Sequence, residues 1–310
     1  MTCNFLKSDF FFFIQKFILL SRLPFHTVGI FPFILGTVLA MYDGYFIRLD
    51  VLLFGILGTF FIMLATYLAG EYYDQDEDSE VISECKSRFS GGAQVIQQGF
   101  IRPSMVWLAS LTALISAGCI GLYIWLGLET GPFTLPLGIL GMIGGFLYSA
   151  KPVRWVSRGL GELWIAFCYG WLPIAAAYYL QTQTISYTLT FISVPIICSI
   201  VAVILINEFA DYEADEKWGK RNLLVRTGMD TGIKVYLIFI LTAIISALIL
   251  AEWKFGSIVI MVPVFFLGFV LCSMAVRNWW KDFDRREWMC GGTILLNLSI
   301  TLTWIIGFLW

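Results

Sequence analysis

Histidine is almost absent from this sequence, and cysteine shows none of the spacings typical of metal or redox sites. His26 is the single histidine, and none of the seven cysteines belongs to a CxxC pair. One histidine excludes histidine-rich metal sites and argues against a Ser-His-Asp triad. The cysteines fall mostly in apolar runs, where cysteine packs as a small hydrophobic residue.

Charge is also scarce. Charged residues make up 14% of the chain and hydrophobic residues 59%, whereas soluble domains carry about 25% charged residues. The net charge of −2 gives no sign of nucleic-acid binding. The composition therefore predicts a polytopic membrane protein. We expect an all-α fold that forms a single transmembrane domain over residues 1–310.

Long apolar stretches recur along the chain and define the expected membrane spans. A transmembrane helix needs roughly 20 such residues. The Phe-rich residues 1–20 are expected to form an interfacial helix, because no small-residue cleavage site follows them. Nine spans are then expected, at about 24–42, 51–73, 104–126, 132–150, 159–181, 187–210, 232–251, 256–276 and 288–310.

The positions of the basic residues predict an orientation for these spans. If the N-terminus is cytoplasmic, every Lys and Arg lies in an inner segment except Arg48 and Lys254. Such an asymmetry sets the orientation of membrane proteins and favours an odd number of spans. We therefore expect an integral cell-membrane protein with its N-terminus and its polar inner loops in the cytoplasm.

Two acidic runs stand out at the inner ends of the second and sixth spans. Glu71-Tyr-Tyr-Asp74-Gln-Asp-Glu-Asp78 follows the second span, and Asn207-Glu-Phe-Ala-Asp211-Tyr-Glu-Ala-Asp215 ends the sixth. Carboxylates four residues apart share one face of a helix and repel each other unless a cation lies against them. Asn and Asp oxygens suit Mg²⁺, which binds few carboxylates together with waters and substrate phosphates. Solvated loops are the simpler interpretation of either run alone, but the repetition favours paired metal sites.

Basic and glycine-rich segments lie between and after the acidic runs. Ser90-Gly91-Gly92 is a loop whose backbone N–H groups could bind an anion, although a plain turn also explains it. Lys and Arg beside paired acidic sites suit a diphosphate whose remaining charge they neutralise. Orientation signals or lipid-headgroup contacts are the alternative roles of these basic residues, which include Lys151, Arg154, Lys220 and Arg221.

Several motifs together resemble a known family. These are Ser21-Arg22-Leu-Pro24, Ser90-Gly91-Gly92, Arg158-Gly-Leu-Gly161-Glu162, Tyr179-Leu-Gln181 and Gly219-Lys220-Arg221-Asn222-Leu223, in addition to the two acidic runs. From about residue 20 onward the chain resembles the UbiA-type intramembrane prenyltransferases. Within them it is most similar to the 1,4-dihydroxy-2-naphthoate polyprenyltransferases of menaquinone synthesis.

The resemblance implies a fold, a reaction and a set of residues. The fold would be a nine-helix bundle around a central cavity that opens toward lipid. Mg²⁺ would bind a polyprenyl diphosphate and stabilise the departing diphosphate, and an electron-rich aromatic acceptor would attack the allylic cation. The implied catalytic and metal-binding residues are Asp74, Asp78, Asp211 and Asp215, with Asn207 as a further metal ligand. The expected substrate-binding residues are Asn207, Arg22, Arg88, Tyr148, Lys151, Arg154, Lys220 and Arg221.

The chain departs from the family pattern at two positions. Gly70 stands where the first motif usually has Asn, four residues before its first Asp, and Glu71 is a possible replacement ligand. Asn222 stands where Thr is usual. These departures weaken the assignment of the acceptor more than that of the fold. Alternative acceptors are 4-hydroxybenzoate, homogentisate, a tetrapyrrole and a glycerol phosphate lipid.

A secondary transporter is the main rival function, because acids within membrane helices often bind ions or substrate. Its acids would lie near the midplane, whereas these cluster at helix ends. A structural membrane subunit would not require two metal-type aspartate pairs. Neither the prenyl chain length nor the oligomeric state follows from the sequence.

Overall fold

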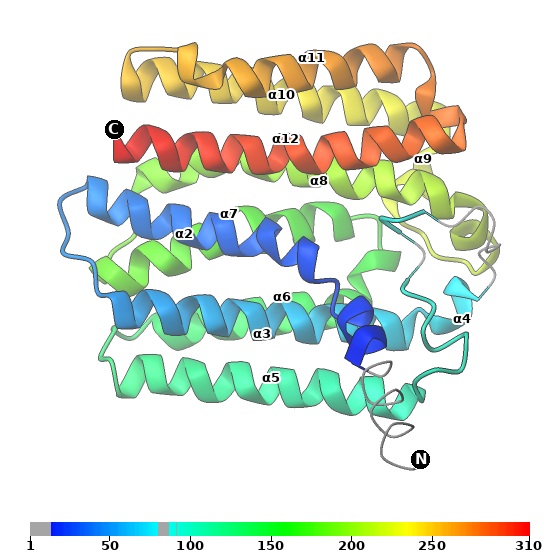
Figure 1. Cartoon of the computed structure of the whole chain (residues 1–310), viewed down its shortest axis with the longest axis horizontal. Coiled ribbons are helices and arrows are strands. Elements are labelled where there is room, and N and C mark those ends of the chain that lie inside the picture. The colour runs from blue at the N-terminus through cyan, green and yellow to red at the C-terminus, as the bar shows by residue number, and fades with distance from the viewer. Residues whose placement is uncertain (1–13, 80–86, 91) are drawn as a thin grey trace, which may run out of the picture.

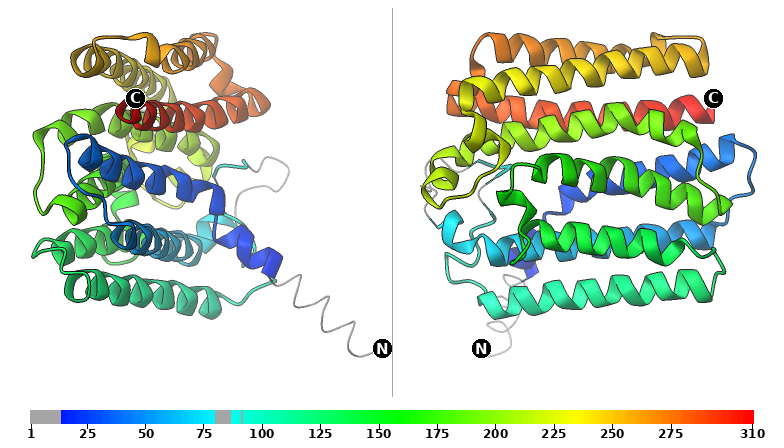
Figure 2. Two further views of the ribbon diagram at one scale, coloured as in Figure 1. Left: turned by 60° about the vertical axis from the view of Figure 1, so that its left-hand side comes forward. Right: turned by 180° about the vertical axis from the view of Figure 1, so that it is seen from behind.

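A computed structural model describes residues 14–79, 87–90 and 92–310 and shows a bundle of helices that run side by side (Figures 1 and 2). The expected N-terminal interfacial helix lies largely outside these residues, although residues 14–20 are helical. The long helices are α2 (Thr27–Tyr42), α3 (Leu49–Tyr73), α5 (Pro103–Leu126), α6 (Thr134–Ser149), α7 (Gly161–Thr182), α8 (Tyr187–Lys217), α10 (Met229–Phe255), α11 (Val262–Val276) and α12 (Phe283–Leu309). Two short helices, α4 (Gln75–Asp78) and α9 (Leu223–Thr227), lie in loops between them.

Eight helical segments of the described chain are long and apolar enough to cross a membrane, not the nine expected from the sequence. The predicted span 132–150 is the exception, because α6 has only 16 residues, short of the roughly 20 that a span needs. It ends at Ser149, where Ala150 turns to an extended conformation (ψ 134°). Helix α6 nevertheless joins the two ends of the bundle (Figure 2).

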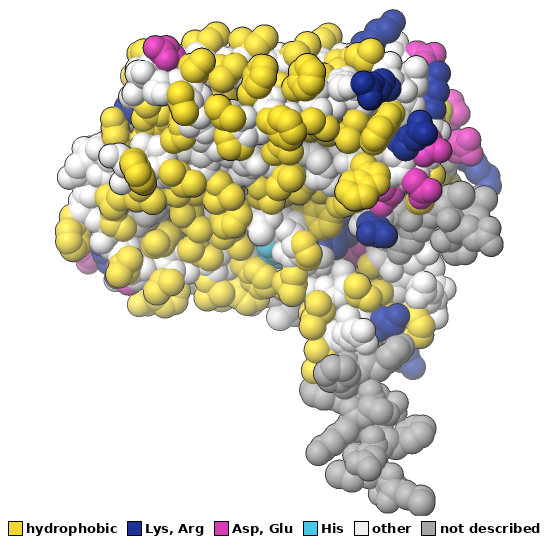
Figure 3. Space-filling view, turned by 45° about the horizontal axis from the view of Figure 1, so that its top comes forward, with side chains coloured by type: hydrophobic (Ala, Val, Ile, Leu, Met, Phe, Trp, Pro, Cys, Tyr) yellow, Lys and Arg dark blue, Asp and Glu magenta, His cyan; other side chains and the backbone are white. Residues whose placement is uncertain are grey.

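The interior of the bundle is apolar and continuous. Helices α2, α7, α8, α10 and α12 contribute most of its largest buried cluster, which includes Leu35, Ile174, Leu205, Tyr236 and Trp304. Large apolar side chains also cover the outside, as Figure 3 shows along the length of the helices. A surface this apolar is stable only against lipid, so the chain is an integral membrane protein.

Charged side chains gather at one end of the bundle, where α4 and α9 lie (Figures 1 and 3). The loops that follow α3, α6, α8 and α11 all meet at this end (Figure 1). Arg48 precedes α3 and Lys254 lies in the last turn of α10, both at the opposite end. The fold therefore brings the two acidic runs to the same end, as the sequence predicted.

Candidate active site

The two acidic runs line a single cavity at the charged end of the bundle. Here the first acidic motif means Gly70, Asp74 and Asp78, and the second acidic motif means Asn207, Asp211 and Asp215. All six residues line one cavity of about 250 Å³, termed the polar cavity. It is also bounded by Arg22, Phe25, Glu71, Tyr67, Ser90, Gly92, Tyr148, Tyr169, Glu208 and Lys220.

The second acidic motif lies on one uninterrupted helix. Helix α8 continues from Tyr187 to Lys217, which confirms the common face expected for Asn207, Asp211 and Asp215. Asp215 is held from two sides: Lys220 Nζ lies 3.0 Å from one carboxylate oxygen, and Asn222 Nδ2 donates to the other at 2.7 Å. The Asn222 side chain also accepts from the backbone N–H of Val225 at 2.8 Å and so caps α9.

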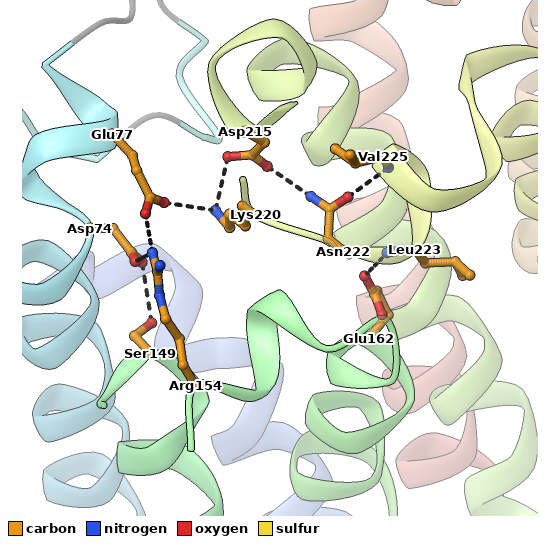
Figure 4. Close-up of polar contacts among 10 residues, drawn as sticks. All are labelled: Asp74, Glu77, Ser149, Arg154, Glu162, Asp215, Lys220, Asn222, Leu223 and Val225. Carbon is orange, nitrogen blue, oxygen red and sulfur yellow. Dashed lines mark hydrogen bonds and ion pairs between the residues drawn. The ribbon is translucent and has the colours of Figure 1, made fainter. Parts of the chain in front are cut away.

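The first acidic motif lies where the helix breaks. Helix α3 ends at Tyr73, Asp74 adopts φ −99° and ψ 6°, and α4 begins at Gln75. Glu77, expected to lie off the face of Asp74 and Asp78, is instead buried on the side of Asp74, because residues three apart on a helical turn are neighbours. Arg154 donates to Asp74 at 2.9 Å and also contacts Glu77, while Ser149 donates to the other Asp74 oxygen at 3.2 Å (Figure 4).

Lys220 connects the two acidic runs. Its Nζ lies 3.0 Å from Asp215 and 3.8 Å from Glu77, so it lies between the second and the first acidic runs (Figure 4). Burial alone would lower the pKa of Lys220, but the charges of Asp215, Asp74 and Glu77 outweigh burial and raise that pKa. The ammonium therefore stays charged and is positioned to meet an anion.

Glu71 holds the loop that follows the first motif. Arg22 donates to one Glu71 oxygen at 2.8 and 3.0 Å, and the Ala93 N–H donates to both oxygens at 2.9 and 2.8 Å. The anion that this glycine-rich loop binds is thus the protein's own carboxylate. Both oxygens of Glu71 are already engaged, which argues against it as a replacement metal ligand.

Asp78 lies against the same loop. A Cβ atom added at Gly92, which has φ +65°, would come within 2.0 Å of an Asp78 oxygen, so only glycine allows this approach. Burial raises the pKa of Asp78 well above its usual value, and the charges of Glu71 and Asp74 raise it further. Burial likewise raises the pKa of Glu77, against the opposing effect of Arg154.

The remaining predicted residues divide into two groups. Arg22, Tyr148 and Lys220 line the polar cavity. Arg154 does not line it but donates a hydrogen bond to Asp74, which does. Arg88, Lys151 and Arg221 are exposed and do not line it. Lys151 and Arg154 do not share a helical face, because α6 has already ended and Arg154 adopts a left-handed conformation (φ 45°).

Several residues that shape the site were not predicted from the sequence to do so. Glu162, at the start of α7, accepts from the Leu223 N–H at 2.7 Å and so fixes the loop that carries Asn222 (Figure 4). Ser149 and Glu77 support Asp74 and Arg154, and Glu208 lines the cavity wall. The Arg-Gly-Leu-Gly-Glu motif marked Glu162 in the sequence, but no local pattern indicated that it accepts a hydrogen bond from the Leu223 N–H.

The oxygen-rich lining fits Mg²⁺, although the ligands are not gathered around one point. Asn207 Oδ1 is buried and has no hydrogen-bond partner among the described residues. Within residues 14–79, 87–90 and 92–310, no three His, Cys, Asp or Glu side chains form a ready metal cluster. Arg154 and Lys220 instead hold the carboxylates of the two motifs.

An apolar cavity of about 310 Å³ adjoins the polar one. It lies among α2, α3, α5, α6 and α7, and the two cavities share Thr66, Ile165 and Tyr169. Glycines of α5 and α6 form part of its wall, and a Cβ added at Gly121 or Gly138 would meet no atom within 4 Å. Glycine inside a helix costs about 0.5–1 kcal/mol relative to alanine. Packing does not require glycine at Gly121 or Gly138. The absence of a side chain at these two positions therefore keeps the cavity wide.

Most of the chain matches the model of a known protein family. The model of the UbiA prenyltransferase family matches residues 29–299. The chain belongs to the UbiA prenyltransferase family. The family match covers every residue of both acidic motifs.

The names of two curated relatives refer to naphthoate-type or naphthoquinone-type acceptors. The chain is 30% identical over 210 residues to the 1,4-dihydroxy-2-naphthoate octaprenyltransferase of Bacillus subtilis, covering 65% of this chain and 62% of that protein. It is 27% identical over 251 residues to the 2-carboxy-1,4-naphthoquinone phytyltransferase of Synechocystis, covering 77% and 76% of the two chains. The match thus spans less than two thirds of the Bacillus protein.

Solved structures confirm the UbiA fold. An apo UbiA homolog from Aeropyrum pernix superposes with a TM-score of 0.68 at 13% identity, covering 92% of this chain and 97% of that one. A UbiA homolog from Archaeoglobus fulgidus bound to GPP and Mg²⁺ gives a TM-score of 0.62 at 14% identity, covering 95% and 100%. At these identities the likeness establishes the fold alone.

Proposed function

We propose that this protein transfers a polyprenyl group from a prenyl diphosphate to an aromatic acceptor, 1,4-dihydroxy-2-naphthoate, in menaquinone biosynthesis. The observation that carries the proposal is the junction of the two cavities. A polar cavity lined by two acidic motifs and Lys220 adjoins an apolar one, and Thr66, Ile165 and Tyr169 line both. This pair of environments suits a molecule with an anionic head and a long hydrocarbon tail.

The head of the donor would occupy the polar cavity. Asp74, Asp78, Asn207, Asp211 and Asp215 would hold Mg²⁺, and the orphaned Asn207 Oδ1 supports this assignment. Bound there, the metal would stabilise the charge that develops on the departing diphosphate. Lys220 and Arg22 line the same cavity and would neutralise phosphate oxygens.

The tail of the donor would occupy the apolar cavity. The wide wall at Gly121 and Gly138 supports this placement because it leaves room for branched isoprene units. Tyr67 and Tyr169 line the polar cavity, and Tyr169 also borders the junction. Their ring faces would stabilise an allylic cation through cation–π attraction.

The choice of acceptor rests on the names of the relatives and on the motif resemblance. Proteins from Bacillus subtilis, Escherichia coli and Haemophilus influenzae similar to this chain are named 1,4-dihydroxy-2-naphthoate octaprenyltransferases. The identities are 27–30% over 55–65% of this chain. This supports a dihydroxylated naphthalene as acceptor.

The test is product formation by purified protein in lipid nanodiscs. Geranyl and longer prenyl diphosphates would be offered with Mg²⁺ and, in turn, 1,4-dihydroxy-2-naphthoate, 4-hydroxybenzoate and homogentisate, with mass spectrometry of the products. We expect Mg²⁺-dependent prenylation and stoichiometric release of diphosphate, with the naphthoate preferred at least about 10-fold in kcat/KM. Prenylation of another acceptor alone would refute the naphthoate assignment. Solute uptake by proteoliposomes without any prenylation would favour a transporter.

A further inference from the structure

A third cavity lies on the outside of the bundle, apart from the two that form the candidate active site. It measures about 410 Å³ and shares no lining residue with either of them. Its walls come from the helical residues 14–20, from α3 and from α5, and include Phe17, Leu64 and Ala109. We call this cavity the outer groove.

The outer groove is apolar and faces lipid. Met105 and Leu108, which line it, are exposed. Its two lining hydroxyls, on Thr112 and Ser116, each donate to a backbone carbonyl of α5 itself, so the lining side chains offer no hydrogen bond to a ligand. From Met105 to Ser116 the groove follows α5 for roughly 16 Å at 1.5 Å per residue. Its shape and chemistry suit a hydrocarbon chain.

Two cations lie at one end of the outer groove. Lys16 precedes the lining residue Phe17, and its Nζ lies 4.1 Å from the centre of the Phe100 ring. Arg102 follows the lining residue Ile101 and precedes α5, which begins at the charged end of the bundle (Figure 1). Arg102 is exposed and makes no ion pair with any residue that the structure describes. The groove thus combines an apolar length with a positive end.

This combination selects one class of occupant. A neutral lipid would fill the groove but would make no ion pair with the cations, and a soluble anion would meet the cations but leave the groove unfilled. Lipid headgroups lie at the level where membrane spans end, which is where Lys16 and Arg102 lie. An anionic phospholipid therefore satisfies both parts, because its phosphate pairs with Lys and Arg while its acyl chain runs along the helices.

We propose that the outer groove binds one anionic phospholipid, with an acyl chain along α5 and the headgroup phosphate on Lys16 and Arg102. The lipid covers Phe17 and so holds residues 14–20 against α3 and α5. These residues lead directly to Arg22, which lines the polar cavity and donates to Glu71. The bound lipid thereby stabilises one wall of the polar cavity, whichever reaction takes place there.

The experiment measures lipid binding by the full chain in detergent after its own lipids have been removed. Phosphatidylglycerol and phosphatidylcholine with identical acyl chains would be titrated into wild type and into the double variant Lys16→Gln/Arg102→Gln, with native mass spectrometry of the bound lipids. A cation beside the headgroup contributes about 5-fold in affinity. We expect wild type to bind one phosphatidylglycerol at least about 10-fold more tightly than phosphatidylcholine. In the double variant this preference should fall to within about 3-fold.

The matched control for charge is Lys281→Gln/Arg285→Gln. Both residues are exposed cations above tryptophan rings, and neither lines the outer groove. This variant loses the same charge and should keep the full preference for phosphatidylglycerol.

A second variant tests the groove itself. Ala109→Phe would fill the groove and should weaken the binding of both lipids by about 10-fold or more. If Ala109→Phe fails to fold in size-exclusion chromatography, Thr112→Phe, at an exposed position of the same wall, takes its place.

Three results would overturn the proposal. Equal affinity of wild type for the two lipids would show that the cations do not select the headgroup. An equal loss of preference in both double variants would indicate a general effect of positive charge. Unchanged binding of phosphatidylglycerol in a folded groove-filling variant would place the lipid elsewhere on the surface.

Discussion

The two acidic motifs have the same spacing but are built differently. Gly70, Asp74 and Asp78 are four residues apart, as are Asn207, Asp211 and Asp215. The second motif lies on one uninterrupted helix, α8, whereas the first is divided between the end of α3, a cap residue and α4. The second therefore sets its spacing through the helix, and the first requires partners from elsewhere in the chain.

Those partners show what the broken motif requires. Arg154 and Ser149 hold Asp74, Arg22 and the Ala93 N–H hold Glu71, and Gly92 makes room for Asp78. In the second motif, Lys220 and Asn222 hold Asp215, and helix α8 itself sets the spacing of the three residues. Substitutions away from the aspartates should therefore affect the first motif more than the second.

The largest effect should come from removing one aspartate of either motif. We expect Asp74→Ala and Asp211→Ala each to lower kcat/KM for the prenyl diphosphate by about 100-fold or more, because each would remove a proposed ligand of the Mg²⁺ that stabilises the departing diphosphate. The measurement is diphosphate release by purified protein, with thermal unfolding as a check on folding. Asp76→Ala, which changes an exposed residue of the same run, should stay within about 3-fold. Full activity in either folded aspartate variant would show that its motif is only a solvated helix end.

Lys220 tests whether the two motifs act as one site. We expect Lys220→Met to lower kcat/KM by about 100-fold, because an anion-stabilising contact in a water-poor site is worth several kcal/mol. Its neighbour Arg221 and the distant Lys151 are exposed, so Arg221→Met and Lys151→Met should change little. Equal losses in all three variants, measured in parallel, would point to a general effect of positive charge rather than a specific contact.

Much of this arrangement was predictable from the sequence, and the limits have physical causes. The all-α class, the meeting of the acidic runs at one end and the common face on α8 follow from hydropathy and from the pitch of a helix. At the break, Arg154 contacts Asp74 and Glu77, which lie 80 and 77 residues away in the chain, and no local pattern indicates such a pairing. Lys151 and Arg154 are three residues apart but do not share a helical face, because α6 ends before both of them.

Gly92 tests the dependence of the first motif on its loop. Gly92→Ala would place a Cβ within 2.0 Å of the Asp78 carboxylate at φ +65°, whereas Gly99→Ala at φ +73° meets no atom within 4 Å. Both variants bear the backbone strain, of order 1–3 kcal/mol, but only the first displaces Asp78. We expect activity to fall about 10-fold more in Gly92→Ala than in Gly99→Ala. Equal activity would mean that Asp78 moves at no cost to the reaction.

The smallest effect should come from making the two motifs alike. Gly70 lacks the side chain that Asn207 has, and a Cβ there would meet only Ser149 Oγ at 3.6 Å. Gly70→Asn should therefore fit and add an oxygen ligand to the first motif. We expect the Mg²⁺ concentration for half-maximal activity to fall about 3-fold, with Gly70→Leu as the control that adds bulk without a ligand. A fall in both variants would exclude coordination as the cause.

Both motifs together should bind one metal–diphosphate complex, and a binding measurement without turnover can show whether they do. Geranyl S-thiolodiphosphate, an analogue that reacts poorly, would be titrated calorimetrically into wild type, Asp74→Ala and Asp211→Ala with Mg²⁺ or with EDTA. We expect binding by wild type only with Mg²⁺, and affinity at least about 10-fold weaker in each variant. Unchanged Mg²⁺-dependent affinity in either folded variant would contradict a site shared by the two motifs.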